Sequence, residues 1–218
     1  MYKPAFLHRP ISICLVLAAL AVYWPVIEHP FVSLDDGVNV YDNPYLRPGS
    51  PVVPPQVWVK PYENLYIPVT YTLWAIEARL SRMFQSDRPA AALSARVFHI
   101  VNVVLHILCA LVVYLILRLV GNEGWPAAFG ALMFTVHPVQ VEPVAWVTGM
   151  KDLLCGFFSL AAIWQYLTAQ DPRRRRRLHY AAATVAFVLA LLSKPTAVVV
   201  PLVAGILDRW AFRRSVRE

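Results

Sequence analysis

The 218 residues are 58% hydrophobic, and charged residues make up only 15% of them. The mean hydropathy of +0.52 is too high for an ordinary water-soluble domain, so the composition indicates a membrane protein. The net charge of +7 does not indicate a nucleic-acid partner, because the basic residues flank apolar runs and no nucleic-acid-reading motif is present. The three cysteines lie inside apolar runs without CxxC spacing, which argues against a disulfide framework or a cysteine metal site.

The first apolar run covers residues 10–27, and as a helix of about 27 Å it is long enough to cross a bilayer. Lys3 and Arg9 precede it, so the positive-inside rule predicts a cytoplasmic N-terminus. Bulky Tyr23 and Trp24 stand where a signal peptidase would need small residues, and we therefore expect an uncleaved helix. The chain then emerges on the extracytoplasmic side, in a periplasm or lumen.

Residues 28–92 are predicted to form a long extracytoplasmic loop. Its first part holds two adjacent carboxylates, Asp35 and Asp36, soon after the first span. Between residues 68 and 84, apolar residues recur on one helical face, which predicts an amphipathic helix lying along the membrane interface. A helix packed on the loop in water is the alternative. The apolar face consists of Val69, Leu73, Ile76 and Leu80, and Glu77, Arg79 and Arg82 lie off it.

A second span is predicted over residues 93–120, returning the chain to the cytoplasm. It carries a polar stripe of His99, Asn102 and His106 at helical spacing. The two histidines are about 10 Å apart along the helix axis, too far to share one metal ion directly. We therefore expect this stripe to make hydrogen bonds to neighbouring elements.

Four further apolar runs follow, and with the first two they predict six membrane segments with both chain ends in the cytoplasm. These runs cover residues 126–136, 144–167, 178–193 and 196–207. Five consecutive arginines, residues 173–177, precede the last two runs. The positive-inside rule assigns them to a cytoplasmic loop, and contact with lipid headgroups is an alternative. The last two runs are interpreted as a hairpin around Lys194.

This topology brings several ionisable residues to the extracytoplasmic face, and such residues near a membrane are functional candidates. A carboxylate there could take the proton of a substrate hydroxyl, and lysines could stabilise a departing phosphate. Sugar transfer from a lipid-linked phosphate donor needs both functions. The residues that the topology gathers are Asp35, Asp36, Glu142, Lys151 and Lys194, with His137 preceding Glu142 in a proline-rich segment.

Several motifs together resemble the transmembrane and tetratricopeptide-repeat O-mannosyltransferase family. In chain order they are LDDGVNV at 34–40, NPYL at 43–46, FHIVNVVLH at 98–106, HPVQVEPVAW at 137–146, KDLL at 151–154 and LLSKP at 191–195. Each motif is modest alone, but their order and their spread over most of the chain make the composite specific.

The resemblance implies an all-α polytopic membrane protein of the GT-C glycosyltransferase fold. It implies a polyprenyl- or dolichyl-phosphate-mannose-type donor, a Ser or Thr hydroxyl of an acceptor protein, and transfer with inversion at the extracytoplasmic face. The catalytic carboxylates would be Asp35 and Asp36. The site would be lined by Asn39, His137 and Glu142, with Lys151 and Lys194 at the donor phosphate. If a divalent metal takes part, its ligands would include Asp36 and Glu142.

The family has more than six membrane helices, followed by a helical repeat array. We therefore expect residues 1–218 to form a single membrane domain that could correspond to the N-terminal part of a larger module. Two other functions remain open from the residues alone. One is a non-catalytic membrane module that binds a partner or a lipid. The other is a small transporter with Glu142, Lys151 and Lys194 along its pathway.

Overall fold

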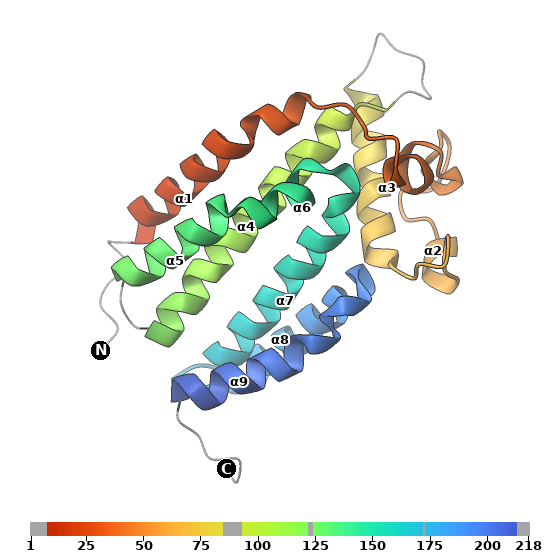
Figure 1. The fold of residues 1–218 in the computed structure, drawn as a ribbon. Helices are drawn as coiled ribbons and strands as arrows, with labels where there is room; N and C mark the ends of the chain where they lie inside the picture. The colour runs from red at the N-terminus through yellow and green to blue at the C-terminus, as the bar shows by residue number, and fades with distance from the viewer. Residues whose placement is uncertain (1–7, 85–92, 122–123, 172, 213–218) are drawn as a thin grey trace.

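A computed structural model describes residues 8–84, 93–121, 124–171 and 173–212, and helices dominate this part of the chain (Figure 1). The expected all-α membrane fold is confirmed. The longer helices are α1 (His8–Tyr23), α3 (Pro68–Met83), α4 (Ala95–Gly121), α5 (Gly124–Val136), α7 (Met150–Thr168), α8 (Arg176–Ser193) and α9 (Val200–Phe212). Two short helices are α2 (Gln56–Val59) and α6 (Val141–Ala145).

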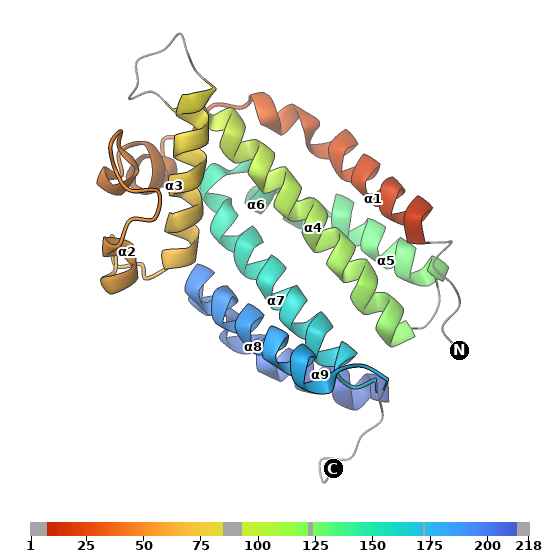
Figure 2. The ribbon, with the colours of Figure 1, turned by 180° about the vertical axis from the view of Figure 1, so that it is seen from behind.

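Six of the longer helices lie alongside one another, and α3 crosses one end of the bundle (Figures 1 and 2). The centre is α4, which packs against α1, α5 and α7, while α8 packs on the far side of α7. Within the described ranges, three segments are long and apolar enough to cross a membrane: Arg9–Glu28, Ala95–Gly121 and Val147–Thr168. The remaining bundle helices are shorter or begin with arginines, so the expectation of six spans stays a prediction.

The bundle has two chemically different ends. We call the end formed by residues 24–67, 137–149 and 194–199 the loop end. We call the opposite end, which includes residues 169–171 and 173–175 and the end of α9, the basic end. The expected hairpin is present, because the chain turns at Lys194 and α9 runs back antiparallel to α8 (Figures 1 and 2). Pro195 lacks a backbone N–H, which favours the end of α8 at this point.

Helix α3 buries the side that carries Tyr71, Trp74 and Glu77. Glu77 is only 1% exposed, whereas Leu80 on the apolar face is 37% exposed. Neither carboxylate oxygen of Glu77 has a hydrogen-bond partner among the described residues, and burial raises the pKa of Glu77 well above its usual range. Helix α3 packs on α4, α7 and α8. Its position at the membrane interface stays a prediction.

The polar stripe of α4 holds neighbouring elements in place. His106 Nε2 donates to the carbonyl oxygen of Thr135 on α5 at 2.9 Å, and Asn102 Nδ2 donates to the carbonyl oxygen of Trp146 at 2.8 Å. The expected hydrogen bonding is therefore confirmed for these two residues. His99 is buried and meets the His29 ring edge-on, with 6.4 Å between ring centroids. Through its hydrogen bond to Trp146, Asn102 holds the segment that leads into α7.

Candidate functional site

The two adjacent carboxylates at the loop end have different environments. Asp36 is fully buried, and its two oxygens accept the N–H groups of Val32 at 2.9 Å and Thr148 at 3.1 Å. Thr148 is 112 residues away along the chain, so Asp36 ties the first loop to the segment before α7. Asp35 points outward, and 51% of its side chain is exposed. Of these two carboxylates, only that of Asp35 is accessible to a substrate.

Asp35 forms an ion pair with Lys151, with 3.5 Å between Oδ2 and Nζ. Lys151 lies in the first turn of α7, and its ammonium group is 5.8 Å from the ring centroid of Trp146. The positive end of the helix dipole disfavours a cation at this position and favours an anion. At the first turn of α7, the helix dipole and the Lys151 ammonium group therefore both attract negative charge.

The next residue along α7, Asp152, forms an ion pair with Lys194 at the end of α8. Lys151 and Asp152, which are adjacent in the first turn of α7, thus form ion pairs with the first loop and with the α8–α9 connection. Together, Asp35, Lys151, Asp152 and Lys194 form what we call the charged site. The sequence predicted three of these four residues at one face but indicated no role for Asp152. Its position next to Lys151 in the KDLL motif was the available signal.

Stability alone does not account for the charged site. The side chains of Lys151 and Asp35 are 17% and 51% exposed, and those of Lys194 and Asp152 are 29% and 43% exposed. Ion pairs with this degree of exposure typically contribute about 0–1 kcal/mol. Two such pairs at one end of an apolar bundle make this region the candidate for binding a charged substrate.

The other expected site residues are less closely linked to the charged site. Asn39 is 6% exposed; its Nδ2 donates to the carbonyl oxygen of Asp35 at 3.0 Å, and its Oδ1 accepts from the Tyr71 hydroxyl at 3.2 Å. Asn39 therefore supports the loop backbone. His137 and Glu142 are both exposed, and His137 Nδ1 accepts the N–H of Val139.

No group of three or more His, Cys, Asp or Glu side chains in the described ranges could hold a metal ion. Asp36, one of the two metal ligands considered from the sequence, already accepts a backbone N–H at each oxygen. Glu142 lies in the first turn of α6 and forms no ion pair among the described residues.

The segment before α7 requires a glycine. A Cβ at Gly149 would lie 2.8 Å from the Cα of Pro143, which is closer than real Cβ contacts. Because this contact is with backbone, it cannot be relieved by a side-chain rotation. Gly149 therefore allows the close turn that places the Thr148 N–H against Asp36.

Replacing Gly149 by Ala is expected to lower the free energy of unfolding by about 1–3 kcal/mol, the usual cost of overpacking. Gly156, on the following helix α7, is the matched control, because nothing lies within 4 Å of a Cβ built there. Gly156→Ala should leave stability unchanged or raise it slightly. Thermal unfolding of the two variants in detergent measures the difference, and equal unfolding temperatures would contradict the steric argument.

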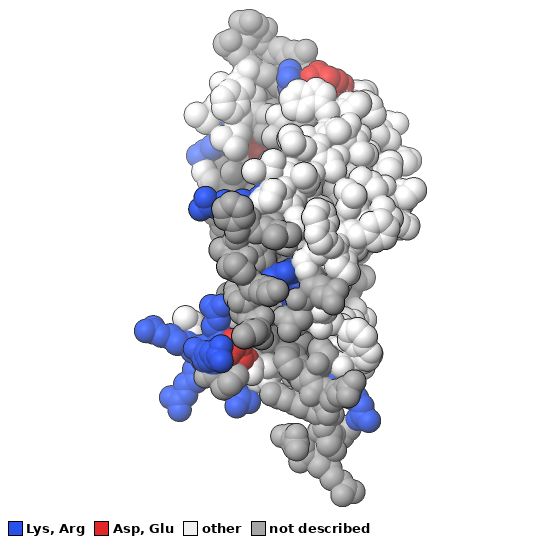
Figure 3. Space-filling model, turned by 90° about the vertical axis from the view of Figure 1, so that its left-hand side faces the viewer, with Lys and Arg blue, Asp and Glu red and all other residues white. Residues whose placement is uncertain are grey.

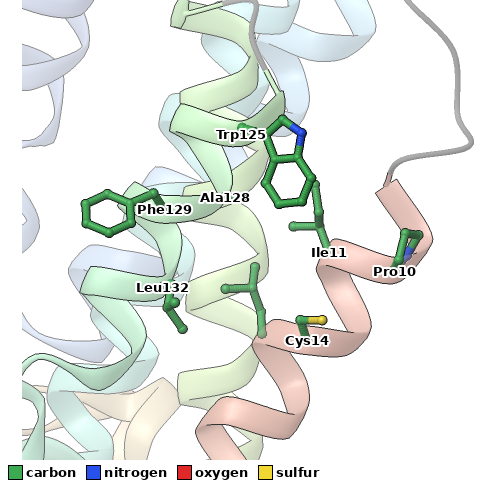
Figure 4. Close-up of a pocket in the computed structure, with 8 residues that line it drawn as sticks. Pro10, Ile11, Cys14, Trp125, Ala128, Phe129 and Leu132 are labelled. Atoms are coloured by element: carbon green, nitrogen blue, oxygen red, sulfur yellow. The ribbon is translucent and has the colours of Figure 1, made fainter.

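An apolar pocket of about 330 Å³ lies between α1 and α5, at the end of the bundle remote from the charged site. Figure 4 shows side chains of both helices around it, including Ile11, Trp125 and Phe129. No ionisable carboxylate or amine lines it, so it offers no group for sugar transfer. A more polar cavity of about 480 Å³ opens at the loop end, where Glu28 and Arg96 form an ion pair at 3.2 Å.

These features define an all-α membrane protein with a charged site at one end of its helix bundle. The chain belongs to the dolichyl-phosphate-mannose-protein mannosyltransferase family, whose model matches residues 90–215. No solved structure gives a significant match to the chain.

Curated relatives include the protein O-mannosyl-transferases TMTC3 and TMTC1 of Mus musculus and Tmtc2 of Drosophila melanogaster. They are 27%, 31% and 26% identical to this chain, over 72%, 71% and 89% of its length. The matches cover only 17%, 16% and 21% of these relatives, so the chain spans about a fifth or less of their length. The family that the sequence motifs resemble is thus confirmed.

Proposed function

We propose that this chain takes part in mannose transfer from a polyprenyl- or dolichyl-phosphate-linked donor to a Ser or Thr hydroxyl of a protein. The observation that carries the proposal is the pairing of Asp35 with Lys151, an exposed carboxylate beside a lysine at a helix N-terminus. Family membership and the similarity to protein O-mannosyl-transferases support the reaction class.

In this reaction, the acceptor hydroxyl oxygen attacks the anomeric carbon of the donor sugar. The bond between that carbon and the phosphate oxygen breaks, and the lipid phosphate leaves with the bonding electrons. The hydroxyl proton passes to the Asp35 carboxylate, which acts as general base. Attack from the face opposite the phosphate inverts the anomeric configuration, and no second nucleophile is needed.

The other members of the charged site, and the buried Asp36 next to it, each have a role in this reaction. Lys151 and Lys194 bind the phosphate and stabilise its charge as the sugar departs. Before the donor binds, Asp35 and Asp152 neutralise the two lysines. Asp36 keeps Asp35 and Lys151 within reach of each other by anchoring the first loop to Thr148. The loop end would face the periplasm or lumen, and both chain ends the cytoplasm.

The assignment of the lysines is tested by Lys151→Met and Lys194→Met, which keep most of the aliphatic side chain and remove the charge. Loss of one charge-assisted contact, worth about 1.5–3 kcal/mol, predicts a rise of about 10- to 100-fold in the KM for donor. Lys60→Met is the matched control, because Lys60 is an exposed loop lysine that makes no ion pair among the described residues.

The measurement is transfer of labelled mannose from dolichyl-phosphate mannose to a Ser/Thr peptide by the chain in lipid vesicles. An unchanged donor KM in both lysine variants would contradict their assignment to the phosphate. Donor binding by the parent chain without any transfer would instead favour the non-catalytic, lipid-binding module.

A further inference from the structure

The basic end of the bundle carries a concentration of arginine. The five arginines of residues 173–177 are all exposed, and the last two of them begin α8. Arg118 and Arg209 lie in the last turns of α4 and α9. Figure 3 shows basic side chains gathered in the lower half of that view. Within the α7–α8 connection the only acidic residue is Asp171, whose carboxylate accepts the N–H of Arg173.

The first turn of α8 offers no acidic side chain to compensate these charges. Arg175 is the N-cap residue and makes no side-chain capping bond, and the first turn of α8 contains no acidic residue. Cations at a helix N-terminus oppose the helix dipole, and the first backbone N–H groups of a helix have no intrahelical acceptor. Both features would be relieved by an anion bound at this point.

A second observation indicates what that anion is attached to. A groove of about 240 Å³ begins beside the arginines and runs between α7, α8 and α9. The Arg176 guanidinium lies over the Tyr180 ring at 5.4 Å from its centroid, and Tyr180 also lines the groove. The groove continues along α8 past Ala183 to Phe187, and its opposite wall on α9 includes Pro201 and Ala204.

We propose that the basic end and this groove together bind an anionic phospholipid, with its phosphate at Arg176 and an acyl chain between α8 and α9. The arginine and the apolar groove meet at Tyr180, so a single amphipathic ligand satisfies both. A phosphate alone would leave the groove empty, and a zwitterionic lipid would leave excess positive charge. Arginine suits a phosphate because its planar guanidinium can donate two parallel hydrogen bonds. This site lies at the opposite end of the bundle from the charged site.

The test is native mass spectrometry of the whole chain in detergent, supplied with equal amounts of phosphatidylglycerol and phosphatidylcholine. The parent chain should retain phosphatidylglycerol about tenfold over phosphatidylcholine. Arg176→Gln should lower retained phosphatidylglycerol about tenfold, whereas Arg9→Gln, an exposed arginine on α1, should not. Ala183→Phe should fill the groove and lower retention of both lipids.

Circular dichroism and gel filtration establish that the variants remain folded. Equal retention of the two lipids by the parent, or unchanged retention in Arg176→Gln, would overturn the proposal. Displacement of phosphatidylglycerol by millimolar glycerol phosphate, together with no effect of Ala183→Phe, would also overturn it. That result would show that only the phosphate is recognised.

Discussion

Replacing Asp35 by Asn is expected to reduce mannose transfer by about 10²- to 10⁴-fold, the usual contribution of a general base. The substitution preserves the size of the side chain and removes its ability to accept a proton. The Asp35 side chain is half exposed, and its carboxylate pairs with Lys151 alone among the described residues. Its replacement should therefore leave folding unaffected. Donor binding should change little, because Lys151 remains available for the phosphate.

Asp42→Asn is the matched control for this experiment. Asp42 is an exposed acid in the same loop, and it lies seven residues from Asp35 without an ion pair among the described residues. Transfer rates at saturating donor and acceptor separate the proton-transfer step from binding. Equal rates in the parent and Asp35→Asn would exclude Asp35 as the base. A similar loss in Asp42→Asn would show a general effect of loop charge.

Replacing Asp36 by Ala is expected to lower the free energy of unfolding by about 2–6 kcal/mol. The carboxylate accepts two backbone N–H groups, and each donor left unsatisfied in a buried site costs about 1–3 kcal/mol. The first loop would then lose its bond to Thr148, and transfer should fall because Asp35 is no longer held beside Lys151. Asp36→Asn keeps one carbonyl acceptor, so an intermediate loss is expected.

Thermal unfolding in detergent measures this effect, with Asp35→Ala as the matched control at the neighbouring exposed carboxylate. The structure predicts a large destabilisation for Asp36→Ala and a small one for Asp35→Ala. The reverse order, or equal stability of both variants, would contradict the assignment of Asp36 as the residue that anchors the loop.

Helix positions were largely predictable because they depend on local properties of the chain. The predicted apolar segments at 93–120, 126–136 and 178–193 correspond to α4, α5 and α8 within two residues at each end. Apolar runs of sufficient length form helices in a membrane, and prolines limit where they extend. The hairpin at Lys194 followed from the charges on either side of it. The number of six spans stays a prediction, since three segments of the described ranges meet the length and hydropathy expected of a span.

The faces of α3 were less predictable. Its apolar positions were identified from their spacing, but the burial of Glu77 was not. Burial of this carboxyl depends on α4, α7 and α8, which pack against α3. Spacing within one helix indicates which residues share a face. It does not indicate which face its neighbours cover.

By itself, the sequence determined the all-α membrane class, the family and the gathering of Asp35, Lys151 and Lys194 at one end. These properties depend on composition, motif order and the direction in which each span runs. Only the tertiary structure distinguished Asp35 from Asp36, and it alone paired Asp152 with Lys194. Two adjacent aspartates have the same chemistry in the sequence. Their environments differ because the Thr148 backbone, 112 residues away, packs against one of them and leaves the other exposed.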